Sequence, residues 1–350
     1  MSKWKYVEYS LYDAKGDNGF YTLRKIKSYN LPINIIIGAR GYGKTFAVKK
    51  YCLEKFFNNG YKTVWVRDTE DAKKVLCDND GKKFFEDVPL MHLPDYNEGA
   101  IKRGEIYVNG TNMGSVLPAS TFQRYKGNSF QECKILVYDE FIREIGRFNK
   151  NTVWETINTF STVLRSRSDA EIYMTANALD QGDSFLEFLG LNLRGFGFYI
   201  NRDKGVVLHY ADTSDKFIKK TTKGIVGKLV VNTPLEKNLI ESKFMNQGDL
   251  TFTKLPSKCR LVCVIQGFAQ GVRLYQCGET YYVTDDINGF TYPQKRFCLS
   301  LEACDRYLPV LPQKIRKRIR ENMEINNILF QNEFQRKFFI NYIFHKFNLP

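Results

Sequence analysis

One short segment of the chain has the residues of a phosphate-binding loop. Residues 38–45 read Gly-Ala-Arg-Gly-Tyr-Gly-Lys-Thr and satisfy the pattern G-x-x-x-x-G-K-[ST] at every defined position. Glycines let backbone N–H groups close around phosphate oxygens, and a helix that starts here adds positive potential. We expect Lys44 to reach the β- and γ-phosphates and Thr45 to offer its hydroxyl to Mg²⁺. The expected nucleotide-binding residues of this loop are Gly38, Ala39, Arg40, Gly41, Tyr42, Gly43, Lys44 and Thr45.

Two adjacent carboxylates follow an apolar run further along the chain. The segment 135–140 reads Ile-Leu-Val-Tyr-Asp-Glu, so both acids stand at the carboxyl end of an expected strand, where open α/β sheets bind ligands. Asp139 is expected to belong to the Mg²⁺ shell, and Glu140 to polarise the attacking water. Acids after a strand are common, and these take their meaning from the phosphate loop. Together the two motifs predict nucleotide hydrolysis.

Two further polar positions suit such a site. Asn177 follows the expected strand 171–175 and could sense the γ-phosphate, although polar strand ends are also ordinary. Arg165 and Arg167 close a helix that begins near Thr152. An arginine there could enter the site of a neighbouring chain and neutralise transition-state charge. A cation at a helix C-terminus is also favourable through the helix dipole alone. The residues by themselves leave both arginines open.

The nucleotide is inferred by elimination. A GTPase is expected to show an N-K-x-D motif after a later strand, but residues 175–180 read Thr-Ala-Asn-Ala-Leu-Asp and lack the lysine. A small-molecule kinase usually lacks the second acid that Glu140 supplies. ATP is therefore the favoured nucleotide, with Mg²⁺ as its metal ion.

These residues need a sheet whose strands end at one edge. Strands are expected at 33–37, 62–67, 134–138, 171–175 and 196–200, and helices at 44–57 and 154–164. A smaller hairpin is expected from strands at 105–108 and 115–117, with Asn109–Gly110 as its turn. Strands that alternate with helices predict an α/β fold with a mainly parallel sheet, the architecture of a P-loop (ASCE-type) ATPase domain.

The pattern changes in the last third of the chain. β-rich runs at 260–265, 272–276 and 280–284 follow one another without helices and predict an antiparallel meander, and helices are expected at 300–307, 312–330 and 333–347. Residues 212–227 are polar, basic and glycine-punctuated, as in a linker. The expected organisation is an ATPase domain at 1–211, a basic linker at 212–227 and a smaller α+β domain at 228–350.

Composition favours a soluble, cytosolic protein with a polyanionic partner. The 350 residues carry a formal net charge of +14, with a sequence pI of about 9.2. No apolar run approaches the ~20 residues of a membrane-spanning helix, and the N-terminus has no signal-peptide core. The eight cysteines form no C-x-x-C pair, so buried, reduced thiols are expected.

Basic residues are clustered in one expected helix. Residues 314–320 hold five cations, and Ile315 and Ile319 are spaced i, i+4. We expect one apolar stripe to dock while the cations face solvent or nucleic-acid phosphates. Lys73–Lys74 and Lys102–Arg103 are further candidates for contacts with a nucleic-acid backbone.

At these residues the chain resembles the DNA-packaging ATPases of phi29-like tailed phages. The resemblance rests on segments in order: IIIGARGYGKT (35–45), VWVRD (64–68), ILVYDEFIRE (135–144), TVLRSR (162–167), MTANA (174–178) and VIQGFAQGV (264–272). It implies a pentameric ring in the host cytoplasm, transiently at the portal vertex of an empty capsid, that threads double-stranded DNA inward and contacts a prohead RNA. It also implies that Lys44 and Thr45 are the Walker A residues, Asp139 the Walker B acid, Glu140 the catalytic base and Arg165 the arginine finger.

The resemblance further implies that the C-terminal domain is similar to the RNase H-like nuclease of larger packaging terminases, without the nuclease. Two-metal cleavage needs several carboxylates around ions ~3.5–4 Å apart. Residues 261–266, the first expected strand of the meander, contain no acid, and Asp285–Asp286 suit a turn better than a metal site. We expect no nuclease activity.

The expected function is ATP-driven movement of double-stranded viral DNA into a preformed capsid by a homo-oligomeric ring. One alternative is another ring P-loop ATPase, such as a conjugation motor, a phage-assembly motor or a helicase. A second alternative is a nucleotide-gated binding or scaffold protein that turns over too slowly to do work. Glu140 argues against the second, because such a protein needs no catalytic base.

Overall fold

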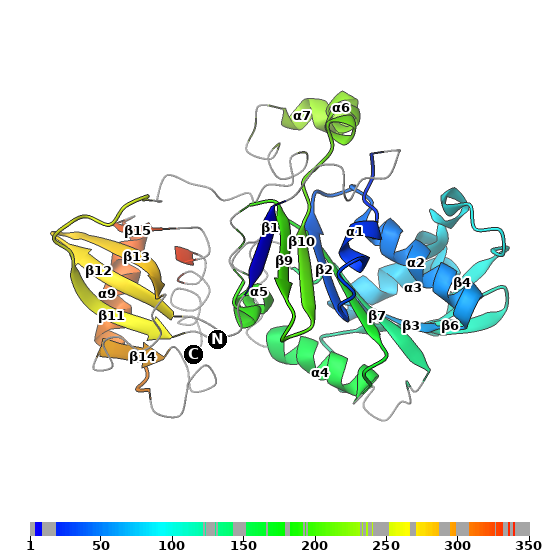
Figure 1. Ribbon diagram of the computed structural model, residues 1–350, viewed down its shortest axis with the longest axis horizontal. Helices are drawn as coiled ribbons and strands as arrows, with labels where there is room; N and C mark the ends of the chain where they lie inside the picture. The colour runs from blue at the N-terminus through cyan, green and yellow to red at the C-terminus, as the bar shows by residue number, and fades with distance from the viewer. Residues whose placement is uncertain are drawn as a thin grey trace. The chain divides into compact units, whose positions relative to one another are not determined.

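The computed structural model divides the chain into two compact units, which are described separately (Figure 1). Unit 1 comprises Met1–Leu179 and Arg194–Met245, and unit 2 comprises Asp180–Leu193 and Asn246–Pro350. The structure describes residues 4–8, 19–121, 123, 130, 132–142, 152–165, 167–178, 183–191, 193, 195–231, 233, 236, 240, 252–266, 271–286, 295–298, 308–325, 327–331, 335, 336 and 339. No helix within these ranges is long and apolar enough to cross a bilayer.

Unit 1 contains a ten-stranded sheet that is parallel in its centre and antiparallel at both ends (Figure 1). Its strands, in spatial order, are β1 (Lys5–Glu8), β9 (Gly197–Asn201), β10 (Val206–Tyr210), β2 (Ile33–Gly38), β8 (Glu171–Asn177), β7 (Cys133–Asp139), β3 (Lys62–Arg67), β6 (Thr111–Pro118), β5 (Glu105–Val108) and β4 (Gly99–Lys102). The six strands from β10 to β6 all run parallel. The sheet confirms the predicted mixed α/β fold with a mainly parallel sheet.

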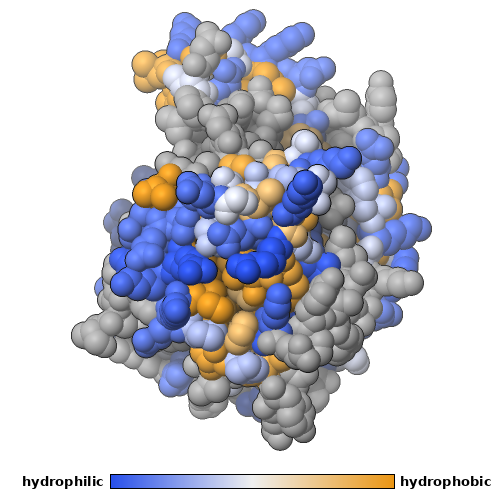
Figure 2. Space-filling model, turned by 90° about the vertical axis from the view of Figure 1, so that its left-hand side faces the viewer, coloured by the Kyte–Doolittle hydropathy of each residue, from blue (hydrophilic) through white to orange (hydrophobic). Residues whose placement is uncertain are grey.

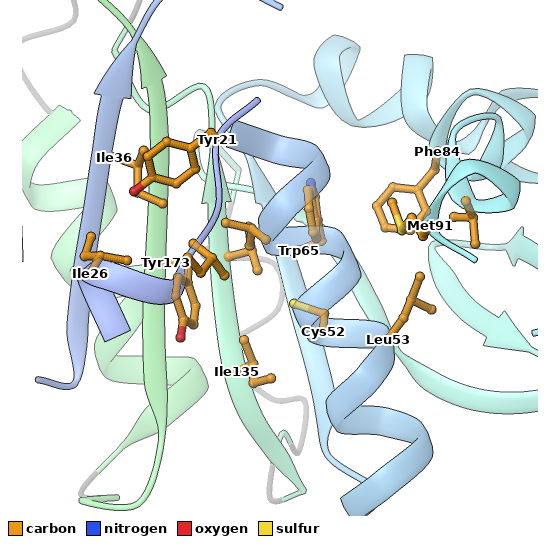
Figure 3. Close-up of a cluster of buried hydrophobic side chains, with 14 of the residues drawn as sticks. Tyr21, Ile26, Ile36, Cys52, Leu53, Trp65, Phe84, Met91, Ile135 and Tyr173 are labelled. Carbon is orange, nitrogen blue, oxygen red and sulfur yellow. The ribbon is translucent and has the colours of Figure 1, made fainter. Parts of the chain in front are cut away.

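Both faces of the central strands are buried, as expected for a parallel sheet covered by helices. On one face, Ile36, Trp65 and Ile135 pack into a core with Cys52 and Leu53 of α2 (Lys44–Asn59), as Figure 3 shows. The alternate residues of the same strands, such as Ile35, Val64 and Leu136, are also buried. Continuous apolar runs therefore identified these strands from the sequence, because neither face had to be polar.

A helix that the sequence did not predict follows β3. It is α3 (Glu70–Phe85), whose first turn is capped by the Thr69 side chain accepting a hydrogen bond from the Ala72 N–H. The backbone leaves helical geometry from Asp78 to Gly81, so the element is two short helical pieces across a kink. Because each piece is short and mostly polar, the sequence shows no sustained apolar repeat that would predict a helix. A short 3₁₀ helix, η1 (Val88–Met91), comes next.

Residues 212–227, predicted as a linker, contain helical structure within unit 1. Helix α6 (Asp215–Lys223) and most of α7 (Ile225–Val230) lie there, and unit 1 continues to Met245. The Ser214 side chain accepts a hydrogen bond from the Phe217 N–H at 3.0 Å and so caps α6. The two helices meet tightly at Gly227, where a Cβ would lie 1.9 Å from the Thr221 carbonyl oxygen. The basic, glycine-punctuated composition thus belongs to a helical hairpin, and the division between the units falls later than predicted.

Unit 2 has a smaller sheet with the predicted antiparallel meander. The meander is β11 (Arg260–Gln266), β12 (Gly271–Cys277) and β13 (Thr280–Asp286), and its outer strands pair in parallel with β14 (Arg296–Cys298) and β15 (Ile328–Phe330). The short helix α5 (Ser184–Leu189) belongs to this unit.

The helix predicted at 312–330 is shorter in the structure. Helix α9 spans Gln313–Glu324, and residues 328–330 form β15 instead, because Ile328 and Phe330 alternate with Leu329 and enter the core beside β13. The helices predicted at 300–307 and 333–347 lie essentially outside the described residues. The amphipathic helix predicted at 154–164 is present in unit 1 as α4 (Thr152–Leu164).

Candidate nucleotide-binding site

The phosphate-loop motif connects β2 to α2, as predicted. β2 ends at Gly38 and α2 begins at Lys44. The six-residue strand therefore leads through residues 39–43 into a helix N-terminus. Gly41 and Gly43 have φ angles of 73° and 91°, in the left-handed region that favours glycine. The loop therefore has the backbone that the motif requires.

Lys44 lies buried inside this loop. Its Nζ donates hydrogen bonds to the carbonyl oxygens of Gly38 at 3.0 Å and Ala39 at 2.5 Å, and to Oδ1 of Asn177 at 3.2 Å. Burial lowers the pKa of Lys44 to about 7, and the negative charges of Asp139 and Glu140 only partly oppose that shift. Burial thus disfavours the charged form of the amine, and the oxygen atoms that hold it could be replaced by those of an anion.

Asp139 is held by three neighbouring elements. Its Oδ1 accepts hydrogen bonds from Thr45 Oγ1 at 2.9 Å and from Thr175 Oγ1 at 2.5 Å, and its Oδ2 pairs with Arg67 Nη1 at 2.8 Å. The strand register explains this convergence, because Asp139 on β7 stands opposite Thr175 on β8. The parallel strands deliver their last residues to one place, as the sequence predicted for Asp139 and Thr45.

Glu140 follows Asp139 in a strained backbone conformation. Its φ of 57° is uncommon for a residue with a side chain and aims the carboxylate away from the strand direction. Arg67 Nη2 lies 2.5 Å from Glu140 Oε2, so one guanidinium pairs with both acids. The Glu140 side chain is half exposed, at 51%, whereas that of Asp139 is 5% exposed. An exposed carboxylate beside a buried one suits two different chemical roles.

Asn177 meets the loop at the sheet edge. In the register of β2 and β8 it stands opposite Gly38, and the next residue, Ala178, donates its N–H to the Gly38 carbonyl at 3.2 Å. The structure therefore brings Asn177 together with Lys44, as predicted from a polar residue at the end of this strand.

The other two side chains predicted in the loop differ in their surroundings. Arg40 is exposed at the loop surface. Tyr42 is 1% exposed and packs edge-on against Tyr21 and Phe217, so its ring belongs to the core and only its backbone faces the loop. The sequence could not separate these cases, because the loop pattern leaves both positions undefined.

The two arginines after α4 have clearly different environments. The Arg167 guanidinium donates to the carbonyl oxygens of Leu164, Cys133, Phe130 and Val163 in its own chain. Arg165 is exposed, has a φ of 51°, and forms no side-chain hydrogen bond or ion pair with another described residue. β8 starts shortly after Arg165, at the sheet edge opposite the phosphate loop, so Arg165 does not approach the loop of its own chain.

Thr175, and the pairing of Arg67 with both acids, are the parts of this site that the sequence did not predict. Arg67 ends β3, and Thr175 lies inside the segment that was singled out for Asn177. The only signal available was position, since both residues stand at the carboxyl ends of predicted parallel strands. That signal places a residue at the edge and does not reveal its partner.

The predicted basic helix docks as expected. Ile319 of α9 is buried in the core of unit 2, and Ile315 packs against that core. Lys314, Lys317 and Arg318 are exposed, although Lys317 lies 3.9 Å from Glu321. Among the coloured residues of Figure 2, hydrophilic ones surround a hydrophobic area near the centre of the view.

The fold and this site define a P-loop protein that binds a nucleoside triphosphate at the carboxyl edge of a parallel sheet. The chain belongs to the podovirus DNA encapsidation protein (Gp16) family, whose family model matches residues 16–307. It is accordingly a DNA-packaging motor ATPase of the phi29-like kind.

Individual relatives agree with this assignment. The DNA packaging protein of Bacillus phage phi29 is 28% identical over 258 residues, which cover 72% of this chain and 75% of that protein. That of Bacillus phage B103 is 26% identical over 263 residues, covering 74% and 79%. A solved structure of the bacteriophage phi-29 viral genome packaging motor assembly has a TM-score of 0.63 at 22% identity, covering 91% of this chain and 97% of that one, and shows the shared fold.

Proposed function

We propose that the site described above hydrolyses ATP, and that hydrolysis moves double-stranded DNA into a preformed capsid. The observation that carries this proposal is the convergence of Lys44, Thr45 and Asp139 at one edge of the sheet, with Glu140 beside them. A phosphate cradle, a metal-binding pair and a second, exposed carboxylate are the groups that phosphoryl transfer to water requires.

The donor atoms present suit Mg²⁺. Thr45 Oγ1 and Asp139 Oδ1 lie 2.9 Å apart, and oxygen ligands of this hard type are those that Mg²⁺ prefers beside nucleotide phosphates. A bound Mg²⁺ would neutralise phosphate charge. Thr45 and Asp139 are the residues proposed to hold it, and Thr175 orients Asp139 through the 2.5 Å hydrogen bond to the same carboxylate oxygen.

Lys44 and Glu140 have separate proposed roles. Lys44 exchanges its hydrogen bonds to the loop carbonyls for phosphate oxygens, which restores its full positive charge. Glu140 accepts the proton of the attacking water, which requires its carboxylate to leave Arg67. Asn177 contacts the γ-phosphate from the same position in which it now accepts a hydrogen bond from Lys44.

Arg165 is the proposed catalytic arginine of a neighbouring subunit. It is exposed and distant from its own loop in the sheet, whereas the contacts of Arg167 within its own chain leave that guanidinium no freedom to act elsewhere. A guanidinium supplied by the next chain would stabilise transition-state charge and make each site depend on its neighbour.

The finer fold assignments have topological support. An ASCE-type ATPase domain is supported because β8 lies between the loop strand β2 and the acid strand β7, and because Glu140 follows Asp139. An RNase H-like fold for the part of unit 2 from Asn246 onwards is supported by a meander whose first strand pairs in parallel with β14. We propose a domain without nuclease activity because residues 261–266, which lie in β11, contain no acid.

The proposed partners follow from the family and from charge. We propose a homopentameric ring at the capsid portal in the host cytoplasm, with double-stranded DNA in its pore and a prohead RNA bound nearby. A net charge of +14 suits both polyanions. The exposed cations of α9 are candidate phosphate contacts, which need no base recognition in a motor that moves any sequence.

The proposal is tested by steady-state ATPase assays of the assembled motor. Lys44→Ala and Glu140→Gln should each abolish turnover, and wild-type turnover in both variants would refute this site. Mixed rings of Arg165→Ala and Glu140→Gln subunits should regain some activity if the arginine acts in trans. Duplex DNA should stimulate turnover more than single-stranded DNA, and the opposite preference would favour a helicase.

A further inference from the structure

A cavity lies beside the first turns of α2 in unit 1. Its volume is about 570 Å³, within the range typical of small-molecule sites. One wall is the segment that precedes β2, with Phe20, Thr22 and Arg24, and the other is α2, with Phe46, Ala47 and Lys50. None of these residues has a role in the site described above.

Residues that line the cavity adjoin the phosphate loop on both of its walls. Phe46 and Ala47 directly follow Thr45, and Lys50 lies about 9 Å along the helix from Lys44 at 1.5 Å per residue. On the other wall, Phe20 touches the loop, since a Cβ at Gly43 would lie 3.5 Å from its Cβ. The Tyr21 N–H donates to the Tyr42 carbonyl at 3.0 Å. A ligand with its phosphates in the loop therefore has this cavity next to it.

The lining suits a flat ring with a polar rim. Phe20 and Phe46 are half-buried, so each keeps part of its aromatic surface accessible. The Phe20 ring packs edge-on against Phe217, with ring centres 6.1 Å apart, and Lys220 Nζ lies 5.1 Å from its centre. Thr22, Arg24, Lys50 and Glu54 place polar groups around these rings. A nucleobase offers the complementary features, because it has an aromatic face and hydrogen-bonding edges.

We propose that this cavity binds the base and ribose of the nucleotide, with Phe20 as the residue that stacks on the base. The proposal rests on the proposed function, because it needs the phosphates in the loop 38–45. It gives a role to Phe20, which packs between the loop and α6 although it belongs to neither. The cavity could instead bind a side chain of another protein or a base of the packaged DNA. Neither of these ligands would need a cavity next to the phosphate loop.

The test separates the base from the phosphates. Isothermal titration of the full chain with Mg²⁺ compares a non-hydrolysable ATP analogue with inorganic tripolyphosphate, which has phosphates alone. Phe20→Ala should weaken binding of the analogue about tenfold, the lower part of what stacking on one base contributes, and should leave tripolyphosphate binding within about twofold. Phe20→Tyr should bind both like the wild type. Phe20→Leu keeps bulk against Phe217 and should lose affinity for the analogue only.

The matched control is Phe57→Ala, which removes another half-buried phenylalanine from α2, away from the cavity. It should leave both affinities unchanged. Equal losses for both ligands in Phe20→Ala and Phe20→Leu would mean that Phe20 shapes the phosphate loop, and unchanged affinities would place the base elsewhere; either result overturns the proposal. A wild-type chain that binds neither ligand would instead refute the proposed function of the loop itself.

Discussion

The buried amine of Lys44 makes nucleotide binding depend on protons. Its pKa is lowered to about 7 by burial among the loop carbonyls. Phosphate oxygens would return the pKa towards the ordinary lysine value of about 10.4. A group whose pKa rises on binding takes up protons at pH values between the two pKa values. Nucleotide binding is therefore expected to take up a proton above neutral pH and to take up almost none in acid.

The expected size of the effect follows from the pKa of Lys44. With a value of about 7 before binding, uptake should be about 0.1 proton per nucleotide at pH 6, about 0.5 at pH 7 and about 0.9 at pH 8. Isothermal titration of a non-hydrolysable ATP analogue in buffers of different ionisation enthalpy measures this number directly. Mg²⁺ in excess keeps the phosphates of the ligand deprotonated at pH 8.

Two variants assign the proton to its residue. Lys44→Arg keeps a cation that stays charged throughout this pH range, so binding should no longer take up a proton. Lys55→Met removes another lysine of α2, remote from the loop, and should leave the uptake unchanged. Uptake near zero at pH 8 in the wild type would refute the reasoning, as would undiminished uptake in a Lys44→Arg protein that still binds.

Three further outcomes are expected. Arg67→Ala should lower the free energy of unfolding by about 3 kcal/mol, because it leaves the buried Asp139 carboxylate without its cation, and denaturant titration measures this; a loss below about 1 kcal/mol would contradict a buried pair. Arg165→Ala should lower the ATPase rate of assembled rings at least 10³-fold with unchanged melting temperature, whereas Arg167→Ala should lower the melting temperature of the isolated chain; the reverse pattern would exchange their roles. Gly114→Ala should cost about 2–3 kcal/mol in the same titration, since its Cβ would lie 1.7 Å from the Thr63 carbonyl oxygen, and an unaffected stability would show that β6 shifts freely.

The sequence predicted the parts of the site that depend on local pattern. The loop 38–45 and the acids 139–140 each follow a buried parallel strand, and such strands are recognisable as unbroken apolar runs. Parallel strands also end at one edge of their sheet, so Asn177 could be expected near Lys44. The predicted α/β class was correct for the same reason.

Pairings between side chains that lie far apart in the sequence could not be predicted. The strand 62–67 that ends at Arg67 was predicted, but the pairing of Arg67 with both acids depends on the register of β3 with β7, which no local pattern specifies. Helices α3 and α6 were not predicted because their sequences are mostly polar. Side-chain caps stabilise both helices, and α6 packs closely on Gly227 of α7, but neither feature appears as an apolar repeat in the sequence. The short strand β15 was read as the end of a helix because three residues cannot show a period.

The position of β2 in the sheet has a consequence for how the chain is made. This strand is complete at residue 38, yet its two neighbours are β8 and β10, which end at residues 177 and 210. At ~5–20 residues per second, synthesis of those neighbours takes roughly 10 to 30 s longer. Until then this apolar strand has neither of its neighbours, and the loop after it has no rigid support. A nascent chain therefore cannot consume ATP before nearly all of unit 1 has left the ribosome, and chaperones have that interval in which to shield residues 33–37.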